Sequence, residues 1–197
     1  MKVLIGCERS GAVRDAFLAL GHEALSCDLE ETDSPGPHYK GSVFDVIDFP
    51  WDIGIFHFPC TDASVSGAKH FAAKKMDGRY YRSASLWMEG WRRASHIPKV
   101  CFEHPVSVMS SLFRKPDQII QPYEYGHPET KATCLWLKGL PKLKPTNNVY
   151  EAMMKLPINE RARIHHMPPG PNRARERSAT YAGIAAAIAT QWSNSHD

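Results

Sequence analysis

A cysteine in the stretch HFPCTDASVSG, residues 57–67, has a setting suited to covalent chemistry. Cys60 follows Pro59 at the end of an apolar run, and small polar residues lead from it to Gly67. A cysteine here has three interpretations: a buried core thiol, a metal ligand or a nucleophile. Because a thiolate attacks strongly and can later leave, we interpret Cys60 as a nucleophile, and the other four cysteines as core thiols.

A carboxylic acid stands in a comparable position further along the chain. Glu103 lies near the end of the apolar run KVCFEHP, residues 99–105. Partial burial raises the pKa of a carboxyl group, which lets it donate a proton to a reacting ring. We therefore predict that Glu103 supports catalysis by Cys60. The alternative is a surface carboxylate in a turn.

A third candidate site lies near the N-terminus. The first apolar run leads into GCERSG, residues 6–11, and a second run ends at Asp28. A glycine-containing turn before a helix allows a ligand to approach the backbone, and a carboxylate after the next strand binds ribose hydroxyls. This pattern favours an adenosine-containing ligand over an ordinary turn with an acidic cap.

The cysteines and histidines do not predict a metal site or a disulfide framework. The five cysteines are far apart and form no CxxC pair, and His165 and His166 are the only adjacent histidines. Phosphatase chemistry also fails, because no arginine stands six residues after Cys7 or Cys60. We therefore expect no metal.

The elements that must position these residues follow a repeating strand–helix order. Apolar runs predict strands, helical spacing predicts helices, and their alternation is typical of a doubly wound α/β fold with a mostly parallel sheet. Ligands bind such sheets at the carboxyl ends of the strands, where the candidate residues stand. The predicted strands span 2–7, 22–28, 51–58, 99–105 and 131–139, and the predicted helices span 10–21, 79–96 and 177–192.

Composition limits the remaining possibilities. The chain has 197 residues, 43% of them hydrophobic, which suits a single domain over residues 1–197. No apolar run is long enough to span a bilayer, and the first one does not resemble a signal peptide, so we expect a cytoplasmic protein without a membrane partner.

Two segments carry positive charge. The segment 161–177 holds five arginines and one acidic residue, which suits either phosphate contacts or a solvated loop. The segment 66–82 is basic and aromatic and is expected to be either a loop that closes over a nucleotide base or a mobile surface loop. Residues 140–172 are rich in proline and are expected to be irregular.

The motifs together resemble those of the DNA cytosine-C5 methyltransferases, which use S-adenosylmethionine. That family has a Pro-Cys motif with serine four residues and glycine seven residues after the cysteine, as in Pro59, Cys60, Ser64 and Gly67. Its Glu-Asn-Val motif is similar to FEHPV, with His104 in the place of asparagine. The wider pattern resembles short phage and prophage methylase-like proteins, expressed in a bacterial host.

The resemblance implies a Rossmann-like methyltransferase fold and methyl transfer to carbon 5 of cytosine in DNA, through a Cys60 adduct at carbon 6. It implies Cys60 and Glu103 as catalytic residues. The implied S-adenosylmethionine site consists of Cys7, Glu8, Ser10, Gly11, Asp28, Asp45 and Pro59, and the implied nucleic-acid contacts are Lys131, Arg173, Arg175 and Arg177.

The sequence departs from the family at three motifs. Ser42 replaces an aspartate near the adenine, with Asp45 as its substitute, and Thr133 and Ile184 replace an arginine and an asparagine. Residues 140–172 are a short insertion in place of a full target-recognition domain. Two alternatives therefore stay open: an enzyme that modifies a pyrimidine nucleotide or a single strand, and a non-enzymatic relative that binds DNA or a protein.

Overall fold

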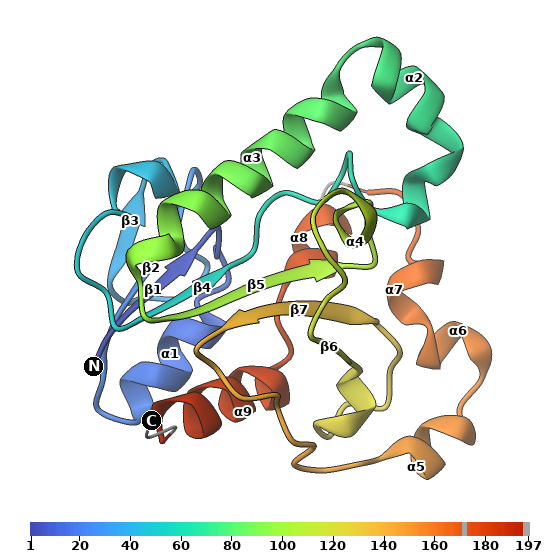
Figure 1. Ribbon diagram of the computed structural model, residues 1–197. Coiled ribbons are helices and arrows are strands. Elements are labelled where there is room, and N and C mark those ends of the chain that lie inside the picture. Colours follow the sequence, from blue (N-terminus) through green and yellow to red (C-terminus); the bar gives the residue numbers. More distant parts are fainter. Residues whose placement is uncertain (171–172, 195–197) are drawn as a thin grey trace.

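Seven β-strands form one sheet in the computed structural model, which describes residues 1–170 and 173–194. Their order is β3-β2-β1-β4-β5-β7-β6 (Figure 1). β1 to β5 run parallel, whereas β7 is antiparallel to both β5 and β6. The strands are β1 (Lys2–Gly6), β2 (Glu23–Asp28), β3 (His38–Lys40), β4 (Ile53–Phe56), β5 (Lys99–Pro105), β6 (Gln118–Ile120) and β7 (Thr133–Lys138).

Helices cover both faces of this sheet (Figure 1). The α-helices are α1 (Ala12–Ala19), α2 (Phe71–Met76), α3 (Arg79–Arg93), α4 (Met109–Leu112), α5 (Tyr150–Met154), α6 (Ile158–Arg161), α7 (Arg163–His166), α8 (Arg173–Ser178) and α9 (Ala182–Ser193). Short 3-10 helices are η1 (Val43–Asp45), η2 (Val65–His70), η3 (Ala94–His96) and η4 (Pro122–Glu124). The arrangement confirms the predicted doubly wound, Rossmann-like α/β fold.

The central strands are apolar throughout because both of their faces are buried. Val3 and Ile5 of β1 pack in one core with α1 and α9, whereas Leu4 packs in the other. Trp87 of α3 is fully buried in that second core, stacked parallel to Trp91. Full burial of a large apolar side chain contributes about 1.5–3 kcal/mol. Residues 87 and 91 are therefore core residues and not an exposed platform for bases.

The strand register aligns the candidate residues along one edge of the sheet. Gly6 of β1 pairs with Cys27 and with Phe56, and Phe56 pairs with Phe102. The residues that follow these four in the chain are Cys7, Asp28, His57 and Glu103. β1 and β4 are the neighbours at which the strand order reverses, and ligands bind at such a point in open α/β sheets.

Three expectations about local structure were wrong. Residues 66–82 form η2, α2 and the start of α3 and not a long loop. The predicted helix 177–192 is divided between α8 and α9, because Tyr181 is extended and caps α9. Residues 140–170 contain the short helices α5, α6 and α7 and are not irregular throughout. Residues 171–172, which belong to both the proline-rich segment 140–172 and the basic segment 161–177, lie outside the described residues.

No helix within the described ranges is both long and apolar enough to cross a membrane.

Candidate active site

The centre of the candidate site is a hydrogen bond between two neighbouring strand ends. Glu103 Oε2 accepts it from His57 Nδ1 at 2.6 Å, and the two side chains are 19% and 10% exposed. The register explains this contact, because Phe56 and Phe102 are paired and place the next residues side by side. The second ring nitrogen of the histidine, Nε2, is buried and has no hydrogen-bond partner among the described residues.

The predicted rise in the pKa of Glu103 is wrong for the protein in this state. Burial opposes ionisation of Glu103, but the hydrogen bond and the charge of His57 outweigh it and lower the pKa to about 2. Conversely, burial disfavours a charged His57, and Glu103 outweighs that effect and raises the histidine pKa. The Glu103 carboxyl group is therefore ionised at neutral pH and has no proton of its own to donate, and its charge favours the protonated form of His57.

Cys60 lies in a tight turn that follows β4. Its carbonyl oxygen accepts hydrogen bonds from the amides of Ala63 and Ser64, at 3.1 and 2.9 Å. The turn is anchored to the end of β5, since Val65 N donates to Val106 O and Val108 N donates to Ala63 O, both at 3.0 Å. The position of Cys60 next to the chain that carries Glu103 is thus set by backbone hydrogen bonds.

The electrostatic environment of Cys60 keeps it protonated in this state. Burial and the Glu103 charge raise the pKa of the thiol, while Lys131 and Arg177 lower it. The two cations come from segments 71 and 117 positions later in the sequence, and they offset only part of the effect of burial and of Glu103.

His104, which stands in the place of an asparagine in the related family, is buried on β5 with 1% exposure. Burial lowers its pKa, whereas the Glu103 charge and the backbone at Pro105 and Pro59 oppose that effect. Its Nδ1 is buried and has no hydrogen-bond partner among the described residues. His104 therefore favours the neutral state, directly beside Glu103 in the chain.

The turn at the end of β1 uses Glu8 as an internal helix cap. Glu8 is 4% exposed, and its Oε1 and Oε2 accept hydrogen bonds from Val13 N at 2.8 Å and Arg14 N at 3.3 Å. Ser10 Oγ donates to the same carboxylate at 3.3 Å. The carboxylate satisfies the first amides of α1 and complements the positive end of that helix. It therefore occupies the position where a phosphate would bind in a dinucleotide-binding protein.

The backbone of this turn has unusual conformations at both ends. Cys7 has a φ of 58° and Gly11 a φ of 75°, both in the left-handed region, which is uncommon for a residue other than glycine. Burial raises the pKa of Cys7 to about 12, with a contribution from Asp28. Cys7 is thus an unreactive thiol close to Asp28.

Asp28 at the end of β2 retains free hydrogen-bonding capacity. Its Oδ1 accepts a hydrogen bond from Glu30 N at 3.0 Å, and burial raises its pKa. The next residue, Leu29, is 74% exposed, which makes it an apolar surface beside the carboxylate. Asp45 instead accepts a hydrogen bond from Tyr39 OH at 3.1 Å, and Ser42 caps η1 by accepting one from Phe44 N at 3.2 Å.

The four basic residues predicted to contact nucleic acid differ in their surroundings. Lys131 Nζ donates to Ala179 O at 3.2 Å, and Arg173 Nε donates to Met167 O at 3.0 Å. Arg175 is paired with Asp33, whereas the charges of Lys131 and Arg177 lower the pKa of Cys60. Arg175 therefore has an acidic partner, and the charges of Lys131 and Arg177 reach the cysteine.

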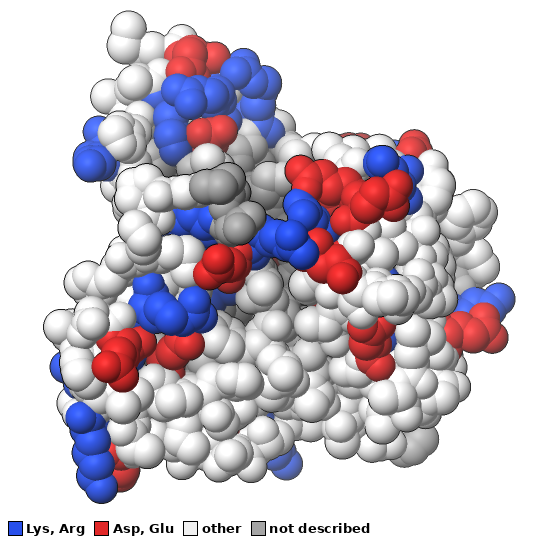
Figure 2. All heavy atoms as spheres, turned by 180° about the vertical axis from the view of Figure 1, so that it is seen from behind, with Lys and Arg blue, Asp and Glu red and all other residues white. Residues whose placement is uncertain are grey.

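Another group of exposed basic side chains lies on the projecting α2 and the start of α3. Figure 2 shows Lys and Arg gathered on this lobe with acidic side chains among them. The exposed members include Lys75, Arg79 and Arg82. Lys74 is buried and joins the lobe to the cysteine turn, because its Nζ donates to Thr61 O at 2.6 Å and pairs with Asp62 at 3.1 Å.

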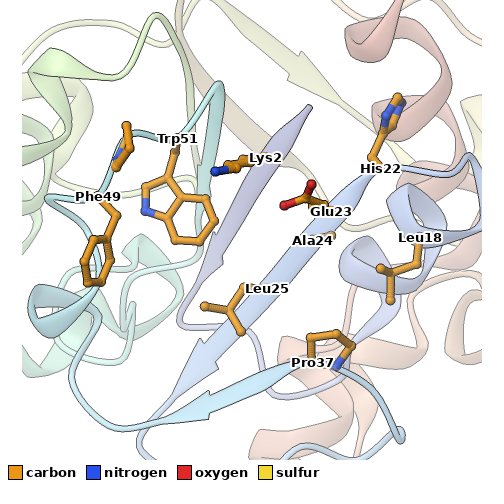
Figure 3. A pocket seen from close by; sticks show the side chains of 10 residues that line it. Lys2, Leu18, His22, Glu23, Ala24, Leu25, Pro37, Phe49 and Trp51 are labelled. Carbon is orange, nitrogen blue, oxygen red and sulfur yellow. The ribbon is translucent and has the colours of Figure 1, made fainter.

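A large apolar hollow lies at the opposite edge of the sheet from these residues. Its volume is about 630 Å³, and it opens beside the first residues of β1 and β2 (Figure 3). It contains none of the candidate catalytic or cofactor residues; its lining includes Leu18, Leu25, Phe49 and Trp51. The candidate catalytic and cofactor-binding residues therefore lie at the carboxyl edge of the sheet, as expected for this fold.

Sequence reasoning missed His57 and Leu29. A signal for the histidine was present, since it is a polar residue at the end of a buried strand and three positions before Cys60. Leu29 follows Asp28 directly, but an isolated exposed leucine is common on protein surfaces. Ile184, by contrast, is 5% exposed and packs in the α1–α9 core, so its side chain does not face the site.

Comparison with known proteins supports the fold. No family model and no curated protein matches the chain. Among solved structures it is similar to the Entamoeba histolytica methyltransferase EhMeth, with a TM-score of 0.51 and 13% sequence identity. The match covers 75% of this chain and 57% of that chain, so the chain spans little more than half of the length of its structural neighbour. At this level of identity, the likeness shows that the two proteins share a fold.

Proposed function

We propose that the protein is an S-adenosylmethionine-dependent methyltransferase that modifies carbon 5 of cytosine in DNA, with Cys60 as the nucleophile. The observation that carries this proposal is the placement of the Cys60 turn, which follows β4 and is joined by backbone hydrogen bonds to the chain directly after Glu103 and β5. Cys60 and Glu103 both lie at the edge of the sheet where β1 and β2 present the candidate cofactor residues. The likeness to a solved methyltransferase is consistent with this assignment.

The carboxyl ends of β1 and β2 fit a nucleoside cofactor that has no phosphate. Glu8 fills the N-terminus of α1 with its own carboxylate, and a negative phosphate placed there would be repelled. S-adenosylmethionine has no phosphate, so it avoids this conflict, whereas a dinucleotide does not. The cofactor supplies an electrophilic methyl group.

Two residues at the end of β2 are suited to the adenosine part. The free capacity of the Asp28 carboxylate matches the two hydroxyl groups of a ribose. Leu29 offers an exposed apolar surface for a flat ring directly beside it. The left-handed turn from Cys7 to Gly11 faces the remaining methionine part in this arrangement, where the backbone can come close to a ligand.

Cys60 and Glu103 supply the chemistry on the pyrimidine. After losing its proton to water, the sulfur forms a bond to carbon 6. The C5=C6 electron pair then becomes C4=C5, and the C4=N3 pair moves onto N3, which takes a proton. Carbon 5 thereby becomes the nucleophile for the methyl group. Water then removes the C5 proton, the electron pair of that bond forms C5=C6 and the sulfur leaves carbon 6 as a thiolate, while N3 gives up the proton that it took and the ring is restored.

The nature of the nucleic acid is a separate part of the proposal. The short helices α5 to α7 occupy the region where the related family has a target-recognition domain. Few side chains there are available to read base edges, so a single strand or a nucleotide is a second candidate substrate. An enzyme that does not have to extract its base from a duplex needs less recognition surface.

Covalent trapping tests the proposal directly. A fluorine at carbon 5 cannot leave as a proton does, so DNA with 5-fluorocytosine, together with S-adenosylmethionine, is expected to give a complex that survives denaturing electrophoresis. Duplex, single-stranded and nucleotide forms are tested in parallel. The Cys60→Ser variant is expected to form no complex, because a serine hydroxyl is hardly ionised near neutral pH.

The matched control is Cys101→Ser, which changes a fully buried thiol on β5. It is expected to keep the trapping reaction and to lose some stability. Trapping that persists in Cys60→Ser would show that the nucleophile has been assigned to the wrong residue. Absence of a complex with every substrate in the wild-type protein would favour a relative that only binds DNA or a protein.

A further inference from the structure

His57 is the titratable residue in direct contact with Glu103, and the reaction above leaves it without a role. His57 directly follows β4 and stands three residues before Cys60. One short segment therefore carries both the proposed nucleophile and the residue that is hydrogen-bonded to Glu103. Its backbone is fixed as well, because His57 N donates to Gly6 O at 2.9 Å. The side chain therefore stands between the candidate cofactor turn and Glu103.

We infer that His57 supplies the proton that Glu103 delivers to N3 of the pyrimidine, so that the two residues act as one proton donor. This inference rests on the proposed function and names a positioning residue for it. The 2.6 Å contact of Nδ1 with Oε2 gives the proton a direct path. The Glu103 carboxylate alone has no proton to donate, because its pKa lies far below neutral pH.

The other groups near Glu103 are less suitable sources. His104 also acts on Glu103, but burial lowers its pKa, so it favours the neutral form, and no side-chain hydrogen bond joins it to Glu103 among the described residues. Lys131 acts on Glu103 as well, while its Nζ donates to the carbonyl of Ala179. In the described part of the chain, only His57 shares a side-chain hydrogen bond with the Glu103 carboxylate.

The charge of His57 is controlled by groups from three directions. Glu103 on β5 and, more weakly, Glu8 in the turn after β1 favour the imidazolium, whereas burial and Lys131 before β7 oppose it. Nε2 has no acceptor among the described residues that would stabilise the charge further. The ring therefore holds its proton mainly because Glu103 is ionised, which makes proton transfer along this bond reversible.

The proton balance closes over one catalytic cycle. The pair begins as imidazolium and carboxylate. As the bond from sulfur to carbon 6 forms, N3 takes a proton from the Glu103 carboxyl, which is replenished from Nδ1, and His57 becomes neutral. When the C5 proton is lost to water and the sulfur leaves as a thiolate, N3 returns its proton through Glu103 to His57. The thiolate then takes a proton from water, so that the cycle releases one proton in total, the one that the methyl group replaces.

The test compares the pH dependence of trapping in the wild-type protein and in His57→Asn. The asparagine amide can donate a hydrogen bond from about the position of Nδ1, but it cannot carry the proton. Single-stranded DNA containing 5-fluorocytosine is used with saturating S-adenosylmethionine. General acid catalysis contributes about 100- to 10,000-fold, so we expect the trapping rate of His57→Asn to fall by at least about 100-fold near pH 8.

The same variant is expected to recover at mildly acidic pH. Without the neighbouring cation, burial raises the pKa of Glu103, so the carboxyl group takes up a proton from water at mildly acidic pH. The rate profile of His57→Asn is therefore shifted to lower pH, which a merely structural role would not produce. An equal rate at every pH, or a uniform loss with an unchanged profile, overturns the inference.

Two further measurements make the outcome specific. His96→Asn is the matched control, because His96 is exposed and its ring nitrogens contact the carbonyl groups of Arg93 and Phe49, away from the candidate site. The rate and the pH profile of this variant are expected to equal those of the wild type. Nitrogen-15 NMR of labelled histidines is expected to show that His57 titrates above its usual pKa in the wild type and below it in Glu103→Gln. An unchanged His57 titration in Glu103→Gln overturns the pair even if trapping succeeds.

Failure of the proposed function gives a different result. If the wild-type protein traps no substrate while the NMR titration shows the pair, the ion pair exists but the methyltransferase assignment and the proton-donor role both fall. If trapping occurs and the profile of His57→Asn is unchanged, the function stands and only the role of His57 is lost.

Discussion

Arg175 of α8 and Asp33 form a two-bond ion pair that connects distant parts of the chain. Nε lies 2.9 Å from Oδ2, and Nη2 lies 2.8 Å from Oδ1. Asp33 Oδ1 also accepts a hydrogen bond from Arg9 Nε at 2.9 Å. The loop that follows Asp28 is thus held by a helix from the C-terminal part of the chain, and the charge of Arg175 is already compensated.

This pairing separates the expected contributions of two arginines to nucleic-acid binding. We expect Arg177→Ala to reduce the slope of log affinity against log salt by about 0.7–0.9, the value of one phosphate contact. Arg175→Ala is expected to change the slope much less, because its partner is Asp33. Fluorescence anisotropy with labelled single-stranded and duplex DNA measures both. Arg92→Ala, an exposed arginine paired with Glu89, is the control. A larger effect of Arg175 would contradict the role of the ion pair.

The carboxylate at the end of β2 is expected to dominate cofactor affinity. Hydrogen bonds to a charged group contribute about 1.5–3 kcal/mol, so Asp28→Ala is expected to weaken S-adenosylmethionine binding about 10- to 100-fold while the protein remains folded. Isothermal titration calorimetry measures the dissociation constant. Glu31→Ala changes an exposed carboxylate of the same loop, paired with Lys40, and is expected to have little effect. Equal losses in the two variants, or no affinity in the wild type, would contradict the assignment.

Gly183 is expected to be indispensable for packing at the start of α9. A Cβ added there would lie 1.9 Å from the carbonyl oxygen of Tyr125, so the backbone would have to shift. Gly183→Ala is therefore expected to lower the free energy of unfolding by about 1–3 kcal/mol or more. Gly170→Ala is the matched control, because a Cβ at that position meets nothing within 4 Å. Urea denaturation compares them, and equal stabilities would show that this contact is easily relieved.

The His57–Glu103 pair is expected to make stability depend on pH at both ends of its range. The pKa of Glu103 falls from 4.5 to about 2 on folding, so its contribution is present above about pH 4.5 and is lost as the pH falls towards 2. The pKa of His57 is raised above 6.5, so its contribution is present below 6.5 and is lost as the pH rises through the raised value.

The stability difference between the wild type and Glu103→Gln is therefore expected to be greatest between about pH 4.5 and 6.5. Urea unfolding at about pH 3, 5.5 and 8.5 measures it, with Glu31→Gln as the exposed control. A difference that stays constant over this range would mean that the two groups are not paired in solution.

Local patterns in the sequence were enough to predict the parallel sheet and the edge at which the candidate residues gather. Apolar runs that end in Asp28, at Cys60 and in Glu103 are local patterns, and parallel strands place their carboxyl ends together whatever the details of packing. The interpretation of Cys60 as a nucleophile needed only its place after Pro59 and the polar turn that follows.

The interactions among these groups depend on long-range packing of the chain. The contact of His57 with Glu103 depends on the register between β4 and β5, which no local pattern encodes. Once formed, it reverses the expected direction of the Glu103 pKa, because a neighbouring cation outweighs burial. The hydrogen bonds by which Glu8 caps α1 depend on the path of the chain between β1 and that helix. The ion pair of Arg175 with Asp33 depends on the packing of α8 against the loop that follows β2. Such contacts join residues without periodic spacing, so their physical effects appear only when the fold is complete.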